Sequence, residues 1–335
     1  MKKKIFNFSN TYSKLSKNFY EKVNPVPVKN PKLEQYNFDL STYLNIDPKN
    51  ISDETGKLIF SGNLIPNGAC PIAMAYAGHQ FGNFVSKLGD GRAVLIGELT
   101  TNNGERFDLQ LKGSGRTSFS RQGDGRSPIG PVVREYVVSE ALHYLGIKST
   151  RSLAIVSTGE NVEREKSIPG GILTRIASSH IRIGTFEYFY YRNDLKSLKE
   201  LVEYTIQRHF FDVNGKNPYE SLLKAVIKSQ ASLISKWMSI GFIHGVMNTD
   251  NTSISGETID LGPCAFMDHF NPNQVFSYID HSGRYSYSNQ GKVMLWNLSK
   301  FAECLLPFIN ENLDKSREQA IDCLNLFPTY FNKYW

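Results

Sequence analysis

The chain has 335 residues, of which 40% are hydrophobic, and a formal net charge of +6. This length and composition allow a sizeable core and two lobes or domains, and they exclude a disordered or fibrous chain. The longest apolar runs, such as residues 93–99 (AVLIGEL), are far shorter than the roughly 20 residues that cross a bilayer, so no membrane span is expected.

Two further classes are excluded by the cysteines and arginines. The four cysteines lie far apart without a C-x-x-C pair, so we expect free thiols and neither a zinc site nor a disulfide framework. Many of the arginines fall in one Gly-rich region and not along a stripe with interleaved aromatic residues. This clustering favours an anionic small ligand over nucleic acid.

Residues 1–60 begin with MKKKIFNFSNTYSKL, which has the basic start of a signal peptide but polar residues where the apolar core would stand. The interpretation is a soluble, cytoplasmic protein. The rest of the segment mixes Asn, Lys, Pro and Tyr without sustained periodicity. It is therefore predicted to be an N-terminal extension draped over a domain.

The next motif, KLGDGRAVLIGE, resembles a hairpin that covers a phosphate. Gly89 and Gly91 would let the backbone approach an anion, and Arg92 supplies a planar cationic group. The alternative is an ordinary Asp-Gly turn. Neither this GDGR nor its second copy at Gly123 matches a P-loop or a dinucleotide-binding fingerprint.

A β-hairpin and a helix are predicted next. AVLIGEL, a polar turn with TNNGE and the alternating RFDLQLK predict a hairpin whose second strand ends at Lys112. Residues 113–131 are too rich in Gly and Arg for a regular element, and VVREYVVSEALHYLG then has apolar residues at helical spacing. This helix offers Glu135 and Glu140 as candidate partners for the lysine.

The remaining pattern completes two lobes. SLAIVSTG and GGILTRIAS predict two more strands, and after Gly184 the chain is predicted to be helical, with one long helix over YESLLKAVIKSQASLISKWMSIG and two near the end. We therefore expect an N-lobe over residues 61–184 and a helical C-lobe over residues 185–335. The order of these elements predicts an α+β, two-lobed protein-kinase-like fold with a small β-rich N-lobe.

The stretch GFIHGVMNTDNTSISGETIDLGP, residues 241–263, follows the long helix. A kinase loop has an Asp two residues after its His and an Asn five residues after that Asp. Counting from His244, these positions hold Val246 and Asn251, and Asp250 directly precedes the Asn. Three interpretations stay open: a dead kinase, a coincidental loop, or a working site whose base has moved to Asp250.

Asn251 and Asp260 fit Mg²⁺, which prefers hard oxygen ligands and takes only one or two of them from the protein when phosphates supply others. A β-hairpin between the two residues would bring their side chains to one end. Asp250 fits either an Asx turn or a base beside the metal. The sequence also has more cations than a simple two-lobed kinase site needs, which predicts a firmly held phosphate tail. These cations are Arg116, Arg121, Arg126, Arg175 and Arg182.

With these residues placed, the sequence resembles the selenoprotein O family, bacterial members of which are protein adenylyltransferases on a pseudokinase-like fold. The resemblance runs from about Pro66 to Asp268, through AGHQFGNF, LGDGRAVLIGE, LQLKGSGRTSFSRQGDGRSPIGPVVREYVVSEALHYLGI, GGILTRIASSHIRIGTFEYF and GFIHGVMNTDNTSISGETIDLGPCAFMD. It implies a nucleotide that is flipped relative to a protein kinase, so that AMP passes from ATP to Ser, Thr or Tyr hydroxyls of proteins and pyrophosphate leaves. Longer members of the family continue past FPTYFNKYW, where this chain stops.

Carried over position by position, the resemblance assigns roles to named residues. It implies that Asp250 accepts the proton, that Lys112 pairs with Glu135, and that Asn251 and Asp260 hold Mg²⁺, with Mn²⁺ as an alternative. The nucleotide contacts that it implies are Gly89, Gly91, Arg92, Lys112, Asp124, Gly125, Arg175, Arg182 and Asp260. Two other functions stay open, a kinase-like phosphotransferase and an inactive nucleotide-binding pseudokinase scaffold.

Overall fold

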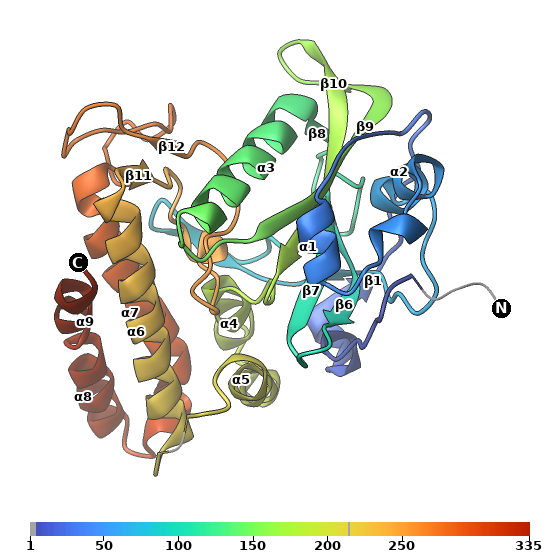
Figure 1. Ribbon diagram of the computed structural model, residues 1–335. Coiled ribbons are helices and arrows are strands. Elements are labelled where there is room, and N and C mark those ends of the chain that lie inside the picture. The colour runs from blue at the N-terminus through green and yellow to red at the C-terminus, as the bar shows by residue number, and fades with distance from the viewer. Residues whose placement is uncertain (1–4, 214) are drawn as a thin grey trace. The chain divides into compact units, whose positions relative to one another are not determined.

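The computed structural model describes residues 5–213 and 215–335. Within them the chain forms two compact units, each built from segments that are separate in the sequence (Figure 1). Unit 1 comprises Met1–Ala75, Leu88–Leu145 and Ser149–His180, and unit 2 comprises Tyr76–Lys87, Gly146–Lys148 and Ile181–Trp335.

Unit 1 is built on an antiparallel sheet whose strand order is β1-β3-β6-β7-β10-β9-β2, with β8 paired to β10. The predicted hairpin is present as β6 and β7, with Lys112 opposite Ala93. The strands are β1 (Tyr20–Lys22), β2 (Lys32–Tyr36), β3 (Ile72–Met74), β6 (Ala93–Thr100), β7 (Arg106–Lys112), β8 (Ser127–Pro128), β9 (Arg151–Glu163) and β10 (Ser167–Ala177).

The helices of unit 1 are α1 (Phe38–Tyr43), α2 (Asp53–Ser61) and α3 (Ile129–Tyr144), with short 3₁₀ turns at Tyr12–Lys14, Lys17–Phe19 and Pro48–Asn50. The predicted helix is α3, which packs against β9 and β10 (Figure 1). Its apolar Val133 and Val137 are exposed, whereas Glu135 and Glu140 are buried. Helical spacing thus predicted the element but not its buried face.

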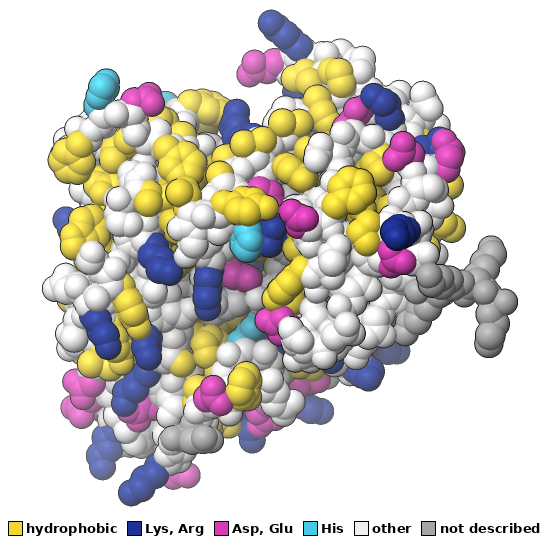
Figure 2. Space-filling view, in the orientation of Figure 1, with side chains coloured by type: hydrophobic (Ala, Val, Ile, Leu, Met, Phe, Trp, Pro, Cys, Tyr) yellow, Lys and Arg dark blue, Asp and Glu magenta, His cyan; other side chains and the backbone are white. Residues whose placement is uncertain are grey.

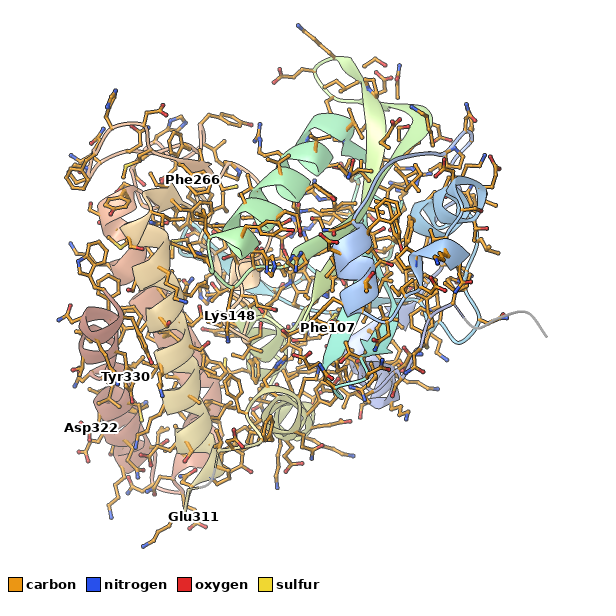
Figure 3. The ribbon with its side chains drawn as sticks, in the orientation of Figure 1. Phe107, Lys148, Phe266, Glu311, Asp322 and Tyr330 are labelled. Atoms are coloured by element: carbon orange, nitrogen blue, oxygen red, sulfur yellow. The ribbon has the colours of Figure 1, made fainter. Side chains whose placement is uncertain are left out.

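The first 60 residues contribute to the core of unit 1. They supply β1, β2, α1 and α2, and Phe6, Leu40 and Phe60 belong to the same buried cluster as Leu111 of β7. On α1, the ring of Tyr43 packs edge-on against Phe107 of β7, with ring centroids 5.9 Å apart (Figure 3). This part of the chain is therefore integral to the sheet, which its mixed composition did not indicate.

Unit 2 is mainly helical. The long predicted helix is α6 (Pro218–Ser239), and Asn217 caps its start by accepting hydrogen bonds from the N–H groups of Tyr219 and Glu220. It packs against α7 (Gln290–Ile309), α8 (Leu313–Leu324) and α9 (Phe327–Tyr334) (Figure 1). The last two arise from one predicted helix that breaks just before Pro328, a residue that cannot continue a helix without losing a hydrogen bond.

The other elements of unit 2 hold the loops. They are α4 (Ile183–Tyr190), α5 (Leu195–His209), a hairpin of β4 (Gly78–Gln80) and β5 (Asn83–Val85), the pair β11 (Phe242–Ile243) and β12 (Ala265–Phe266), and the 3₁₀ turns η4 (Thr249–Asn251) and η5 (Tyr287–Asn289). Phe266 packs against Phe242 across the β11–β12 pair, with ring centroids 5.3 Å apart (Figure 3).

The β-hairpin predicted between Asn251 and Asp260 is absent from the described structure. The segment pairs with other parts of unit 2 instead of with itself, since the N–H of Ile254 donates to Ile181 O and the N–H of Thr258 donates to Lys148 O. Long-range partners therefore satisfy the backbone groups that a local hairpin would have paired.

None of the helices in residues 5–213 and 215–335 combines the length and the apolar character needed to span a membrane. On the face shown in Figure 2, Lys and Arg side chains are scattered among Asp and Glu.

Candidate active site

In unit 1, Lys112 at the end of β7 forms a buried ion pair with Glu135 on α3. Lys112 Nζ lies 2.6 Å from Glu135 Oε2. Glu140, the other candidate on this helix, binds Arg151, whose Nε and Nη2 donate to its two oxygens at 2.8 and 2.7 Å. Because five residues rotate an α-helix by about 140°, the two glutamates point in different directions, and only Glu135 contacts the lysine.

Arg175 of β10 binds the second oxygen of the same carboxylate. Its Nε and Nη2 lie 2.9 and 2.5 Å from Glu135 Oε1, and its Nη1 donates to Gln110 at 3.2 Å. The Arg175 side chain is 1% exposed, so these hydrogen bonds are strengthened by the low-dielectric surroundings. Glu135 thus fixes two cations, Lys112 and Arg175, beside each other within the sheet.

Gly89 and Gly91 bring the loop before β6 against the Gly/Arg-rich segment. Gly89 has a φ of +69°, and a Cβ there would lie 2.2 Å from the ring of Phe119. A Cβ on Gly91 would lie 2.7 Å from the Phe119 carbonyl oxygen. Both positions therefore need glycine for packing within unit 1, whatever else the loop binds, while the neighbouring Arg92 is exposed.

Asp124 and Gly125 lie in the second GDGR motif. The Asp124 carboxylate accepts hydrogen bonds from both terminal nitrogens of Arg164 at 2.9 and 3.0 Å, which lower the pKa of Asp124 below its ordinary value. The Gly125 carbonyl accepts the N–H of Gly115 at 3.0 Å. The second GDGR motif therefore contacts other residues of unit 1 through the exposed Asp124–Arg164 ion pair and the Gly115–Gly125 backbone hydrogen bond.

In unit 2, Asp250 is a buried carboxylate on the turn η4. Its Oδ2 accepts a hydrogen bond from Gln80 Nε2 at 3.1 Å, and its Oδ1 has no hydrogen-bond partner among the described residues. Burial raises the pKa of Asp250 to about 6, although the Gln80 hydrogen bond and the charge of Arg182 counteract it. The carboxylate is therefore a stronger base than an exposed aspartate.

Asp250 is positioned by a buried network that joins η4, α4 and the β4–β5 hairpin. Glu187 of α4 accepts the Thr249 hydroxyl at 2.5 Å with one oxygen, and His79 Nδ1 lies 2.5 Å from the other. The backbone N–H of His79 in turn donates to the Thr249 hydroxyl at 2.7 Å. At Gly78, a Cβ would lie 2.6 Å from Asp250 Oδ1, so only glycine leaves space for the carboxylate.

Sequence reasoning assigned no role to His79, Gln80 or Glu187. The first two lie in the motif AGHQFGNF, which contributed to the family resemblance, and this was their one signal. Glu187 lies in GGILTRIASSHIRIGTFEYF, another of those motifs, and had no signal of its own, because a glutamate on a helix is an ordinary surface residue until its burial is known.

Arg182 forms hydrogen bonds to two of the predicted residues of this loop, Asp250 and Asp260. Its Nη1 donates to the Asp250 carbonyl oxygen at 2.6 Å and to Asp260 Oδ2 at 2.5 Å. Asp260 has a φ of +59°, a conformation that aspartate adopts more readily than most residues. The buried guanidinium thus connects the turn η4 with the Asp260 carboxylate.

The backbone of Val246 occupies the place of the kinase aspartate in this loop. Its carbonyl accepts a hydrogen bond from Asn251 Nδ2 at 3.0 Å, and its N–H donates to His244 Nδ1 at 3.4 Å. His244 Nε2 therefore carries the proton and donates to Ile259 O at 2.8 Å. These contacts orient Asn251 so that its carbonyl oxygen Oδ1 accepts no hydrogen bond from the described protein.

The donor set of Asn251 and Asp260 fits Mg²⁺. Both offer hard oxygen atoms; the Asn251 amide nitrogen donates to Val246 O, and its Oδ1 accepts no hydrogen bond from the described residues. Within residues 5–213 and 215–335, no group of three or more His, Cys, Asp and Glu side chains is arranged to hold a metal ion. A cation here would depend on ligands from a nucleotide as well as on these two residues.

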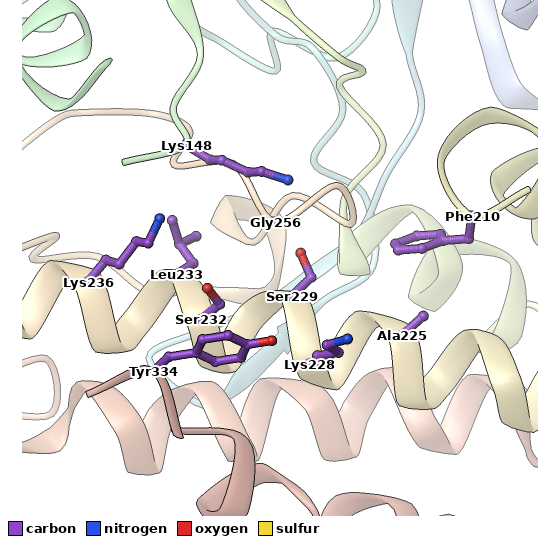
Figure 4. Close-up of a pocket in the computed structure, with 10 residues that line it drawn as sticks. All are labelled: Lys148, Phe210, Ala225, Lys228, Ser229, Ser232, Leu233, Lys236, Gly256 and Tyr334. Carbon is purple, nitrogen blue, oxygen red and sulfur yellow. The ribbon is translucent and has the colours of Figure 1, made fainter. Parts of the chain in front are cut away.

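A separate pocket of about 310 Å³ lies over α6 in the same unit (Figure 4). Figure 4 shows Lys228 and Ser229 of α6 on one side and Lys148 on the other, with Tyr334 of α9 near its edge. The pocket includes none of the predicted site residues.

Comparisons with known proteins place the chain in a family. A family model described as protein adenylyltransferase SelO matches residues 3–335. Proteins called protein nucleotidyltransferase YdiU are 55% identical to the chain in Bradyrhizobium diazoefficiens, 54% in Clostridium botulinum and 52% in Bacillus cytotoxicus. In each case 98% of this chain is aligned with 67% of the relative.

Among solved structures, ROP2 from Toxoplasma gondii, described as a virulence factor with a protein-kinase fold and no enzymatic activity, is 9% identical with a TM-score of 0.31. The match covers 77% of this chain and 87% of that one.

Proposed function

The chain belongs to the SelO family of nucleotidyltransferases, and on this premise we propose that it transfers AMP from ATP to Ser, Thr or Tyr hydroxyls of protein substrates. The observation that carries the proposal is Asp250, a buried carboxylate with one oxygen held by Gln80 and the other without a partner among the described residues. It stands beside Asn251, in a loop whose kinase-type base position is occupied by Val246.

In the proposed reaction, Asp250 Oδ1 accepts the proton of the acceptor hydroxyl. The hydroxyl oxygen then forms a bond to the α-phosphorus of ATP, and the bond between that phosphorus and the oxygen bridging to the β-phosphate breaks. Pyrophosphate leaves with the electron pair. The Gln80 amide donates a hydrogen bond to Oδ2, which leaves the lone pairs of Oδ1 available to accept the proton.

The cations stabilise the charge of the phosphates and of the leaving pyrophosphate. We propose that Lys112 and Arg175 bind phosphate oxygens while Glu135 holds their side chains in place. Arg182 contributes a further guanidinium, which is already fixed by the Asp250 carbonyl and Asp260.

Asn251 and Asp260 would hold Mg²⁺, with Mn²⁺ as an alternative, and the ion would supply positive charge to the phosphate oxygens. The role of the protein is to present these two oxygen ligands. The Val246 carbonyl orients Asn251, and Arg182 orients the Asp260 carboxylate.

The experiment incubates the purified chain and an acceptor protein with ATP labelled on either the α- or the γ-phosphate. We expect α-label in the protein, with a mass increment of one AMP group. Transfer of γ-label would instead identify a phosphotransferase, and labelling by neither would identify a nucleotide-binding scaffold.

A matched pair of variants controls for the loss of charge. Asp250→Asn removes the candidate base and should strongly slow α-label transfer. Asp322→Asn removes an exposed carboxylate on α8 of the same unit and should transfer normally (Figure 3).

A further inference from the structure

A second pocket of unit 2, of about 450 Å³, adjoins the hairpin that positions Asp250. Among the described residues, its lining has two cations, two aromatic rings and no acidic side chain, and includes Phe81, Ser282, Arg284, Asn289, Lys292 and Trp296. We propose that this pocket binds an acidic side chain, Asp or Glu, of the protein segment that carries the acceptor hydroxyl. The identity of the occupant rests on the proposed function; the anion preference rests on the pocket alone.

Arg284 is a preorganised cation in this pocket. The carbon of its guanidinium lies 4.7 Å from the centre of the Trp296 ring. Gly82 also lies close to the guanidinium, since a Cβ built on Gly82 would be 3.6 Å from the same carbon. Its Nε is buried without a hydrogen-bond partner, and no carboxylate among the described residues forms an ion pair with it. A planar group held in this way loses little entropy when it binds a carboxylate.

The neighbouring charges leave the pocket positive. Lys292 is exposed on α7 and adds a second cation to the lining. The nearest acidic residue in sequence, Asp280, uses its carboxylate to accept the backbone N–H groups of Arg284 and Tyr285 at 2.9 and 2.8 Å. On α7, Glu303 is engaged by Lys300 at 2.8 Å. An incoming anion therefore meets two cations, and the carboxylates of Asp280 and Glu303 already have other partners.

The pocket is linked to the candidate base by one turn of backbone. Phe81, which lines the pocket, directly follows Gln80, whose amide donates to Asp250. The N–H of Phe81 donates to both Asn248 Oδ1 and the Tyr285 hydroxyl at 3.1 Å, although its φ of +51° is unfavourable for a phenylalanine.

These hydrogen bonds hold the strained turn in place. A peptide that inserts an acidic side chain into the pocket would therefore have its adjoining residues near Asp250.

An acidic peptide suits the lining better than a free phosphate group. The aromatic faces of Trp296 and Phe81 can cover the apolar part of a peptide side chain, while Ser282 and Asn289 offer hydrogen bonds to its backbone. A phosphate site typically gathers several backbone N–H groups at a glycine-rich turn, whereas no glycine is among the described residues that line this pocket.

Binding of two fluorescent peptides tests the proposal without requiring turnover. Both carry the same central Ser, Thr and Tyr acceptors, flanked in one by glutamates and in the other by lysines. We expect the wild-type protein to bind the glutamate peptide at least about tenfold more tightly, and Arg284→Gln to remove most of this preference. Lys292→Glu should weaken the glutamate peptide and strengthen the lysine peptide.

Lys228→Glu is the control for Lys292→Glu, because it makes the same charge change at an exposed lysine that lines the other pocket. It should leave the preference within about twofold of wild type. Equal binding of the two peptides by the wild type would overturn the proposal. So would equal effects of Lys228→Glu and Lys292→Glu, or peptide binding that inorganic phosphate displaces while neither variant affects it.

Thermal unfolding of each variant separates a lost contact from a lost fold. Lys292 is exposed, so its variant remains informative if Arg284→Gln unfolds. Transfer of α-label to the same peptides is then measured separately. Selective binding without any transfer would keep the pocket and reject the proposed function, whereas equally efficient transfer to both peptides would keep the function and reject the pocket.

Discussion

Gly78→Ala is the most direct test of the position of Asp250. The added Cβ would lie 2.6 Å from Asp250 Oδ1, and ordinary van der Waals contact begins at about 3.4 Å. The carboxylate or the β4 backbone must therefore move by about 0.8 Å. Gly78 does not have a positive φ, so the substitution adds this steric conflict without backbone strain of the left-handed kind.

A displacement of this size should slow AMP transfer by about 100-fold, because a misplacement of about 1 Å in a catalytic group commonly has that effect. Nucleotide binding should change little. The assay is the initial rate of α-label transfer at saturating ATP, with ATP affinity measured by calorimetry. Gly130→Ala is the matched control, since nothing lies within 4 Å of a Cβ there. A Gly78→Ala protein that folds and transfers AMP at the wild-type rate would refute the assignment of Asp250 as the base.

Three further variants test Asp250 itself, the proposed metal ligand Asp260 and the buried carboxylate of Glu140. Asp250→Asn should slow transfer by about 10²- to 10⁴-fold with ATP affinity retained, as measured by the two assays above. Asp260→Ala should abolish the response of transfer to added Mg²⁺, because it removes the anionic ligand of the pair; an unchanged Mg²⁺ titration would show that the ion binds elsewhere. Glu140→Gln should lower the free energy of unfolding by about 1–3 kcal/mol at pH 7 in urea titrations. Burial raises the pKa of Glu140, but hydrogen bonds from Arg151, Ser152 and Asn37 outweigh it and keep that pKa below the ordinary 4.5. The stabilisation is therefore present above pH 4.5 and is lost as the pH falls through the folded-state pKa, so a difference between wild type and variant that persisted at lower pH would contradict it.

The choice between Glu135 and Glu140 shows where local pattern is insufficient. Both lie on the predicted helix, and both are acidic residues that could meet a lysine on the preceding strand. The rotation of α3 against β9 and β10 decides the matter, and it buries Glu135 against Lys112 and Glu140 against Arg151. The apolar residues could not indicate this rotation, because two of them, Val133 and Val137, face solvent.

The glycines of the GDGR loop show a second kind of ambiguity. A phosphate-covering turn and a tightly packed turn need the same residue type, since both require close approach of the backbone. The structure shows the packing role, through the contact of Gly89 and Gly91 with Phe119. The phosphate role remains a proposal that nucleotide binding by the Arg92→Ala variant would test.

The order of elements and the residue types that bear the chemistry could be determined from the sequence by itself. Hairpins and helices depend on periods of two and about 3.6 residues within short windows, so the β6–β7 hairpin, α3 and α6 were predictable. The tertiary structure alone decided that the first 60 residues complete the sheet and that Gln80 binds Asp250 across 170 positions of sequence. Such contacts form because the folded chain brings distant segments together and must satisfy their buried polar groups, a requirement that leaves no periodic signal in either segment.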